Sequence, residues 1–360
     1  MGTGTSVTGV TDPSVRGSPP HKTAFFVSES AHRSRARSLH AGGRLVKRAV
    51  PGHPYSLDDG LGIRRVERDG RTQTEILALA PVLANHPIVE QAIRTRASRY
   101  ADLDVRSLAT VRRLERSSGS LHVVTEMAAG VRLSHLLAHL ESTGAVVPEP
   151  AIFELASSII NAVASLHAWP GGLTHGAINP AHILLTNNGR VLLTDGVFGG
   201  GFEALQRNRE ALWKEFRLAM PPVASLARFD QQTDVTQMGA SILALILHRP
   251  LRASEYPRGV SDLVMTATEA ASLAGSSASE FTLRTWLQAA LQIHVKLAFR
   301  SAVEAQRAFS EIAKTRESRS EGATALQALL QTMCAETPNE PPIVMNAPTT
   351  TSAVPERKAR

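Results

Sequence analysis

The stretch LTHGAINPAHILLTNNGRVLLTDGV, residues 173–197, decides the fold of this chain more than any other part of its 360 residues. Two apolar runs, residues 183–185 and 191–193, flank the turn Asn187-Asn188-Gly189. An Asn-Gly pair between two apolar runs is a strong β-hairpin signal. A polar loop precedes the hairpin, and an Asp-Gly pair follows it. The stretch therefore predicts a loop, a tight hairpin and an acidic side chain where the second strand ends.

Helices are predicted on both sides of this stretch, because apolar residues recur there with the spacing of one helix face. These helices are predicted at residues 133–140, 152–166, 235–248, 281–298 and 301–314, with a shorter amphipathic piece at 326–333. The segment 235–248 is apolar on all sides, which is typical of a central helix.

The chain before residue 130 has a different character, since short apolar runs alternate with turn signals. Strands are predicted within residues 44–80, at 107–116 and at 120–127, with one helix at 86–103. This order predicts a two-lobed α+β fold. The predicted parts are a disordered basic arm (1–42), a small β-rich lobe (43–127), a larger helical lobe (128–315) and a mostly disordered tail or linker (316–360).

The segment from His175 to Val197 resembles the catalytic loop of the protein kinases and the metal-binding strand that follows it. That family reads roughly HRDLKPENILL, then a glycine-containing hairpin, then a strand ending in DFG; this chain reads HGAINPAHILL, a similar hairpin and TDGV. The agreement is good over residues 100–314 and weaker over 44–100. The resemblance implies a serine/threonine-kinase-type fold, with Glu126 at the hinge, Asp234 capping the catalytic-loop backbone and Arg300 as the structural arginine.

The same resemblance implies that the phosphoryl-transfer groups are degraded. Phosphoryl transfer needs positioning and charge neutralisation, yet Ala177 stands at the position of the catalytic aspartate and its methyl group cannot accept a proton. His182, a poor ligand for magnesium, replaces the metal-binding asparagine, and Asn179 replaces the lysine that steadies the phosphate. Asp195 keeps the place of the DFG aspartate as a residual metal or nucleotide group. Gly196 replaces the phenylalanine, so the packing contact with the small lobe is predicted to be lost.

The small lobe is predicted to lack the groups that grip a nucleotide. The family pairs a strand lysine with a helix glutamate, but no lysine occurs from residue 48 to residue 213. The best match to that strand offers only Glu75 as a charge. Glu90 is the candidate for the helix carboxylate, and Arg94 or Arg96 is the candidate replacement for the lysine.

Three further features are interpreted as structural. Bulky side chains follow Gly60-Leu61-Gly62 and would block a close approach of phosphate to the backbone, so an ordinary turn is predicted there. Pro222 replaces the activation-segment glutamate that would pair with Arg300. His175 is expected to pack and to hydrogen-bond to backbone, whereas His182 is expected to face solvent or a pocket.

Composition limits the remaining possibilities. The single cysteine, Cys334, excludes an intrachain disulfide, and a reducing cytoplasm is predicted. The longest apolar run, residues 241–248, is too short to span a bilayer. The net charge is +7, and a basic stretch at 32–48 has no interleaved aromatic residues. A solvated arm is favoured there over contact with nucleic acid or anionic membrane through Arg33, Arg35 and Arg37.

Three functional hypotheses follow. The first is a catalytically inactive kinase-like module, a pseudokinase, that regulates or scaffolds an unknown protein partner in bacterial-type cytoplasmic signalling, with neither ATP nor magnesium assigned to it. The second is a weakly active or atypical serine/threonine kinase, or an ATP-binding protein, that uses Asp195 with a repurposed arginine. The third is a basic-arm adaptor for nucleic acid or anionic membrane.

Overall fold

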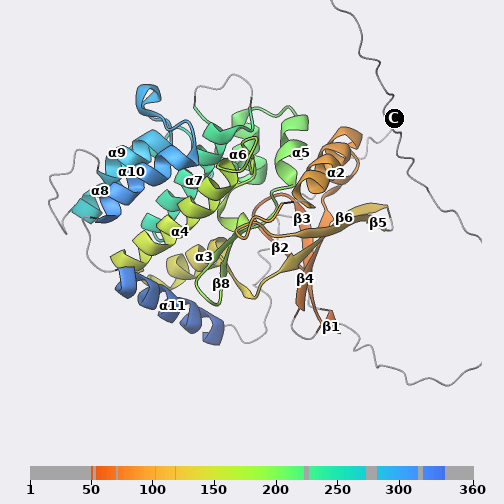
Figure 1. The fold of residues 1–360 in the computed structure, drawn as a ribbon, viewed down its shortest axis with the longest axis horizontal. Helices are drawn as coiled ribbons and strands as arrows, with labels where there is room; N and C mark the ends of the chain where they lie inside the picture. Colours follow the sequence, from red (N-terminus) through yellow and green to blue (C-terminus); the bar gives the residue numbers. More distant parts are fainter. Residues whose placement is uncertain are drawn as a thin grey trace, which may run out of the picture. The chain divides into compact units, whose positions relative to one another are not determined.

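The computed structural model describes residues 50–51, 54–69, 72–101, 103–117, 119–222, 227–272, 282–314 and 319–336. All of them belong to one unit of the chain, Lys47–Arg360. A β-rich lobe precedes residue 128 and a mainly helical lobe follows it (Figure 1), as the sequence predicted. The predicted arm, with Arg33, Arg35 and Arg37, lies outside the described residues.

None of the helices within these ranges has the length and apolar character that crossing a bilayer would require.

The small lobe is built on one antiparallel sheet, in which β2 pairs with β3 beside the path β1-β3-β4-β6-β5. Its strands are β1 (Val50–Pro51), β2 (Tyr55–Ser56), β3 (Gly62–Asp69), β4 (Thr72–Leu79), β5 (Val111–Ser117) and β6 (Ser120–Met127). Side chains alternate between the two faces of a sheet. The register places Arg64 opposite Leu77, and Glu75 opposite Thr125, on one buried face. Two charged side chains therefore point into the molecule from adjacent strands.

Two helices complete this lobe: α1 (Pro81–Ala84) and α2 (Pro87–Ala101). Helix α2 packs against α5 (Phe198–Ala204), a glycine-rich helix that follows the DFG-like segment. A side chain on Gly201 would come within 3.2 Å of Val89 and 3.3 Å of Ile93, so a small residue permits this close packing. The two helices share one apolar core with the inner face of the sheet.

The large lobe holds a three-stranded antiparallel sheet, in the order β7-β8-β9, and most of the helices. The predicted hairpin is present as β8 and β9, and β8 also pairs with β7. The elements are β7 (Gly130–Arg132), α3 (Leu133–Thr143), α4 (Glu149–His167), η1 (Pro180–His182), β8 (Ile183–Thr186), β9 (Val191–Leu193), α6 (Arg209–Phe216), α7 (Gln231–Ile246), α8 (Val260–Ser272), α9 (Leu283–Ala290), η2 (Val295–Leu297) and α10 (Ala302–Lys314). Helix α7 is buried along most of its length, as its all-round apolar pattern predicted.

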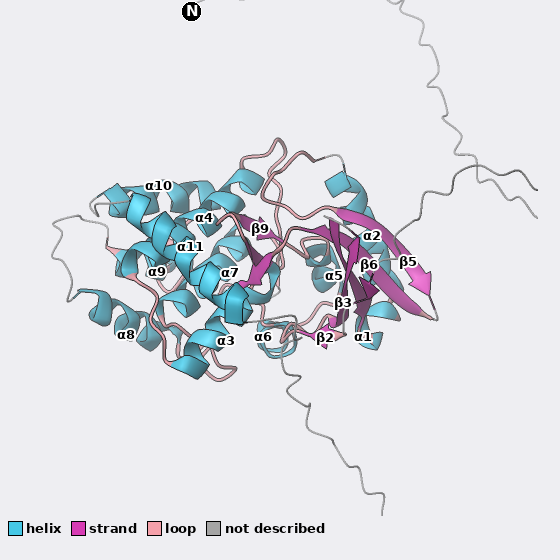
Figure 2. Ribbon diagram, turned by 90° about the horizontal axis from the view of Figure 1, so that it is seen from below, coloured by secondary structure: helices cyan, strands magenta, loops and turns pink. Residues whose placement is uncertain are grey.

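Two predicted boundaries differ from the structure. The helix predicted over 281–298 ends at Ala290, and Gln292 soon after it has a left-handed φ of 54°, a conformation that does not continue a helix. The predicted tail contains helix α11 (Arg319–Glu336), which packs along α4 (Figure 2). Its buried Leu326, Leu330 and Met333 form one apolar stripe that covers the large lobe. The amphipathic piece predicted at 326–333 lies within this helix, which is longer than predicted.

Candidate functional site

Asp234 on α7 holds the backbone of the catalytic-loop-like segment. Its carboxylate accepts hydrogen bonds from the N–H groups of His175 and Gly176, each at 2.6 Å, and lies 3.0 Å from His167 Nε2. Burial alone would raise the pKa of Asp234, but the hydrogen bonds from His167 and from the N–H of Gly176 lower it. This is the bonding that the kinase resemblance implies for Asp234.

Asn179 and the 3-10 turn after it are fixed within the same loop. The Oδ1 atom of Asn179 accepts from the N–H groups of Ala181 (2.8 Å) and His182 (3.1 Å), and its Nδ2 donates to the carbonyl of Phe216 at 3.2 Å. The side chain is buried. Asn179 thus caps η1 and ties the loop to α6, with both ends of its amide bonded within the protein.

Arg64 lies at the centre of a buried ion cluster between the two lobes. Its guanidinium is 2.7 Å from Asp59, 2.6 Å from Glu75 and 3.3 Å from Asp195, and its side chain is 0% exposed. Asp195 belongs to the large lobe and the other three residues to the small lobe. One cation therefore joins the DFG-like aspartate to the inner face of the sheet.

Arg132, at the end of β7, adds a second guanidinium to this ion cluster. It donates to both carboxylate oxygens of Glu75, at 2.8 and 2.7 Å, and lies 3.6 Å from Asp195. It also donates to the carbonyl of Ala181 and to Oγ1 of Thr194. Both hydrogen bonds to Glu75 come from the Nη2 atom of Arg132, and hydrogen bonds between ionised groups are stronger than those between neutral groups.

His182 links the cluster to the catalytic-loop-like segment. Its Nδ1 lies 2.5 Å from the carbonyl oxygen of Ala177, and its Nε2 lies 3.1 Å from Asp59. Both partners are hydrogen-bond acceptors. The cluster thus brings Arg64, Arg132 and His182 against three carboxylates (Asp59, Glu75, Asp195). His182 was expected to face solvent or a pocket, and the solvent alternative is wrong, since its side chain is fully buried.

The cations keep the buried carboxylates ionised. Burial would raise the pKa of Asp195, but the charges of Arg64, His182 and Arg132 lower it to about 2. Burial likewise opposes ionisation of Glu75, and the two arginines more than offset it, so its pKa is lowered. Tyr55 donates its hydroxyl to Glu75 at 2.5 Å. The carboxylates of the cluster are thus paired with arginines of the chain itself.

The residues present do not fit ATP with magnesium. One oxygen of Asp195 faces Arg64, and the other accepts from Thr194 Oγ1 at 2.7 Å and faces Arg132. A metal ion would have to displace guanidinium groups from a side chain that is 5% exposed. No group of three or more His, Cys, Asp or Glu side chains in the described ranges is placed to hold a metal. The backbone of Asp195 has a left-handed φ of 65°, a conformation that is uncommon for residues other than glycine.

The Gly60-Leu61-Gly62 segment is an ordinary turn, as predicted, but it packs down onto the large lobe. A side chain on Gly60, whose φ is 64°, would come within 2.2 Å of the carbonyl oxygen of Glu215. Beside it, Asp58 pairs with Arg217 at 2.7 Å. Because the turn lies this close to the large lobe, the adjacent Asp59 contacts both Arg64 and His182 between the lobes.

With Gly196 in place of the phenylalanine, the small lobe contacts this region through helix α2. Tyr100 on α2 donates its hydroxyl to the carbonyl of Thr174 at 2.7 Å, and Arg96 donates to the carbonyls of Thr174 and His175. A side chain on Gly196 would come within 3.0 Å of both Tyr100 and His175. The aromatic ring that fills this space therefore comes from α2 instead of the DFG position.

His175 is buried beneath this contact. Its Nδ1 accepts from the N–H of Ala177 at 3.3 Å, in line with its expected packing role. Burial lowers its pKa to about 4. The imidazole is therefore neutral at physiological pH.

Several predicted residues lie apart from the cluster. Glu126 is on the outer face of the sheet, where it pairs with Arg112, so it does not share a site with Asp195. Glu90 pairs with Arg94 and with Arg116 on the surface. In the part of the chain that the structure describes, Arg300 is exposed and its backbone N–H bonds to the Glu304 carboxylate.

Neither candidate lysine replacement reaches the cluster, because Arg94 pairs with Glu90 and Arg96 binds backbone carbonyls. The guanidinium groups beside Asp195 come from Arg64 and Arg132 instead. From the sequence, Arg64 was interpreted only as a bulky neighbour of the glycine turn. The available signal was the alternation along the strand, which places Arg64 on the same face as Val66, and a buried arginine requires carboxylate partners. Asp59, Arg132 and Tyr55 carried no such signal.

The comparisons with known proteins agree with the fold. No family model matches the chain, and no curated protein matches its sequence. Among solved structures, the chain is similar to a point mutant of the kinase domain of PknI from Mycobacterium tuberculosis, with 17% identity and a TM-score of 0.54 over 74% of this chain and 95% of that one. It is also similar to the kinase domain of maize SIRK1, solved bound to AMP-PNP, with 15% identity and a TM-score of 0.51 over 77% and 97%. The chain therefore has a two-lobed, protein-kinase-like fold.

Proposed function

We propose that the chain is a pseudokinase, a kinase-fold module that transfers no phosphate and acts by binding a protein partner in signalling. The observation that carries this proposal is the engagement of Asp195 by Arg64 and Arg132 inside a closed ion cluster. The one acidic residue retained from the metal-binding machinery is already neutralised by the protein's own cations.

The position of the catalytic base supports the same proposal. Ala177 has a buried methyl group in the small-lobe core, and its carbonyl oxygen faces His182. General-base catalysis contributes roughly 10²–10⁴-fold to enzymatic rates. The groups that would orient an acceptor hydroxyl are thus replaced by groups that hold the loop.

The acceptor side of the site is also engaged by the chain itself. Asn179, at the position of the phosphate-steadying lysine, donates to the carbonyl of Phe216 on α6. The glycine turn at residue 60 rests against Glu215 and Phe216. These contacts join the small lobe, the catalytic-loop-like segment and α6 without a nucleotide, which suits a module that presents a fixed surface to a partner.

A radiolabelled phosphate-transfer assay tests the proposal, with purified full chain, magnesium or manganese, and a generic protein acceptor. The expected result is no transfer above that of the Asp195→Asn variant. Nucleotide-dependent transfer that Asp195→Asn abolishes would overturn the proposal and favour the atypical-kinase hypothesis. A matched Asp262→Asn variant, changed at an exposed position of α8, controls for the handling of the protein.

A further inference from the structure

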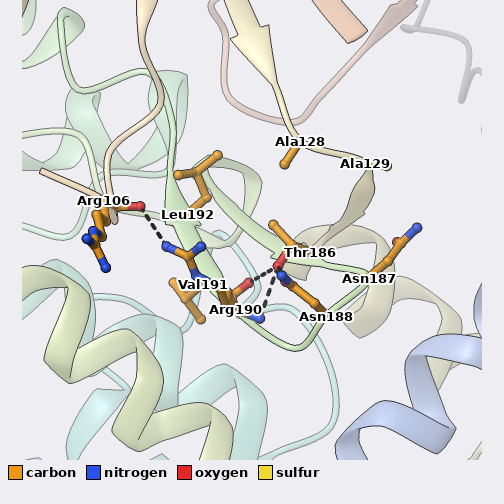
Figure 3. A pocket seen from close by; sticks show the side chains of 9 residues that line it. All are labelled: Arg106, Ala128, Ala129, Thr186, Asn187, Asn188, Arg190, Val191 and Leu192. Carbon is orange, nitrogen blue, oxygen red and sulfur yellow. Dashed lines mark hydrogen bonds between the residues drawn. The ribbon is translucent and has the colours of Figure 1, made fainter. Parts of the chain in front are cut away.

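A surface pocket of about 310 Å³ lies away from the ion cluster, on the segment that joins the two lobes (Figure 3). Ala128 and Ala129, between β6 and β7, form one side of it. Asn188, in the turn between β8 and β9, and Arg106, between α2 and β5, lie on other sides. The pocket, called the hinge pocket below, therefore takes its walls from both lobes.

The hinge pocket combines an apolar floor with positive charge. Leu192 and Ala128 supply apolar surface, whereas Arg106 and Arg190 are the two basic residues of the lining. None of the nine described residues that line the pocket is acidic, and neither guanidinium has a carboxylate partner in the described part of the chain. A cleft lined by charges of one sign concentrates ligands of the opposite sign.

Two of the polar side chains are already oriented. Figure 3 shows the Arg190 side chain beside Leu192, with its Nη2 donating to the carbonyl of Arg106 at 3.3 Å. The Oδ1 atom of Asn188 accepts from Thr186 Oγ1 at 2.5 Å, so the rest of this amide consists of N–H donors. A guanidinium and an amide donor are the groups that recognise a phosphate or a carboxylate.

We propose that the hinge pocket binds a small anion with an apolar body, a compound that carries a phosphate or carboxylate group on a ring or short chain. Arg190 would bind the anionic group, Asn188 would donate to it, and Leu192 and Ala128 would contact the apolar body. This site does not depend on the ion cluster, so it stands independently of the proposed pseudokinase function.

An NMR titration of the ¹⁵N-labelled full chain tests this proposal with three probes: phenyl phosphate, benzoate and the neutral benzyl alcohol. The expected result is saturable shifts at the amides of Ala129, Asn188 and Arg190 with at least one of the two anions. Benzyl alcohol should bind at least about tenfold more weakly, because it lacks the charge-assisted hydrogen bonds. The stronger of the two anions identifies the phosphate or the carboxylate class.

Two variants test whether anion binding depends on the pocket itself or only on the positive charge of the surface. Arg190→Gln should weaken binding of the stronger anion at least about tenfold, and Ala128→Leu should do the same by filling the pocket while it keeps the charge. Arg99→Gln, at an exposed arginine on α2, should leave binding unchanged. The proposal is overturned if neither anion gives saturable shifts at the pocket amides. It is also overturned if Arg99→Gln weakens binding as much as Arg190→Gln.

Discussion

The two sides of the catalytic-loop-like segment differ in what their charged groups contact. On one side, Asp234 accepts hydrogen bonds from the loop backbone, as the kinase resemblance implies. On the other side, Asp195 contacts Arg64 and Arg132, two side chains of the chain itself. The loop backbone thus keeps the acceptor that holds its shape, whereas Asp195, which follows the hairpin, is paired with arginines of the chain.

This difference shows that holding the loop and handling phosphate are separable tasks. Backbone N–H groups must be satisfied whether or not a nucleotide binds, so the role of Asp234 is fixed by the fold. A buried carboxylate such as Asp195 also needs a counter-charge. In this chain, arginines from β3 and β7 meet that need, and Arg64 thereby joins the small lobe to Asp195 of the large lobe.

The largest expected effect comes from removing the carboxylate beneath the loop. Asp234→Ala would leave the N–H groups of His175 and Gly176 and the His167 side chain without their acceptor. We expect a loss of about 5 kcal/mol in the free energy of unfolding, because each buried unsatisfied group costs about 1–3 kcal/mol. Urea unfolding measures it, and a loss below that of the exposed control Asp262→Asn would contradict the assigned role.

A similar but smaller loss in the free energy of unfolding is expected when the central arginine of the ion cluster is removed. Arg64→Met would leave three buried carboxylates with fewer counter-charges, at a cost of about 4 kcal/mol. The matched control is Arg65→Met, next along the same strand, where the side chain is 46% exposed and pairs with Glu67. We expect the control to change stability by less than about 1 kcal/mol. Equal losses in both variants would refute a buried cluster centred on Arg64.

Stability should fall as the solution is acidified, in two stages. The folded pKa of His175 is about 4 and its ordinary value is 6.5, so the unfolded chain binds more protons between these values and stability rises with pH there. His135, whose pKa burial also lowers to about 4, acts in the same direction. Below this range, Asp195 contributes, because its folded pKa of about 2 lies below its ordinary value of 3.8.

Urea unfolding at a series of pH values measures this dependence. His175 alone accounts for up to about 3 kcal/mol between pH 6.5 and pH 4. His175→Gln should flatten the curve over that interval, whereas His294→Gln, at an exposed position, should not. An unchanged slope in His175→Gln would show that its imidazole is not buried in the neutral form.

The smallest effect concerns the ring exchanged between the DFG-like position and α2. Gly196→Phe would force a second ring against Tyr100 and His175, with an expected loss of about 2 kcal/mol. Adding Tyr100→Ala should recover part of that loss, because the new ring then occupies the vacated space. A double-mutant cycle by urea unfolding measures the coupling, and strictly additive losses would contradict the exchange.

What the sequence predicted depended on how local each signal was. The hairpin around Asn188 and the helical pattern of α7 depend on neighbouring residues, and both were predicted correctly. The ion pair between Arg64 and Asp195 joins residues 131 positions apart, and nothing near either residue specifies the other. The contribution of Tyr100 was missed for the same reason, since the missing ring at Gly196 was visible but its replacement lay on another element.

Equilibrium dialysis of radiolabelled ATP against the full chain, with and without magnesium, tests the central claim most directly. The account predicts no saturable binding at millimolar nucleotide, for the wild type and for Asp195→Asn alike, because Arg64 and Arg132 already neutralise the retained aspartate. Saturable, magnesium-dependent binding that Asp195→Asn weakens would contradict it. A magnesium ion would then bind the Asp195 carboxylate in place of Arg64 and Arg132.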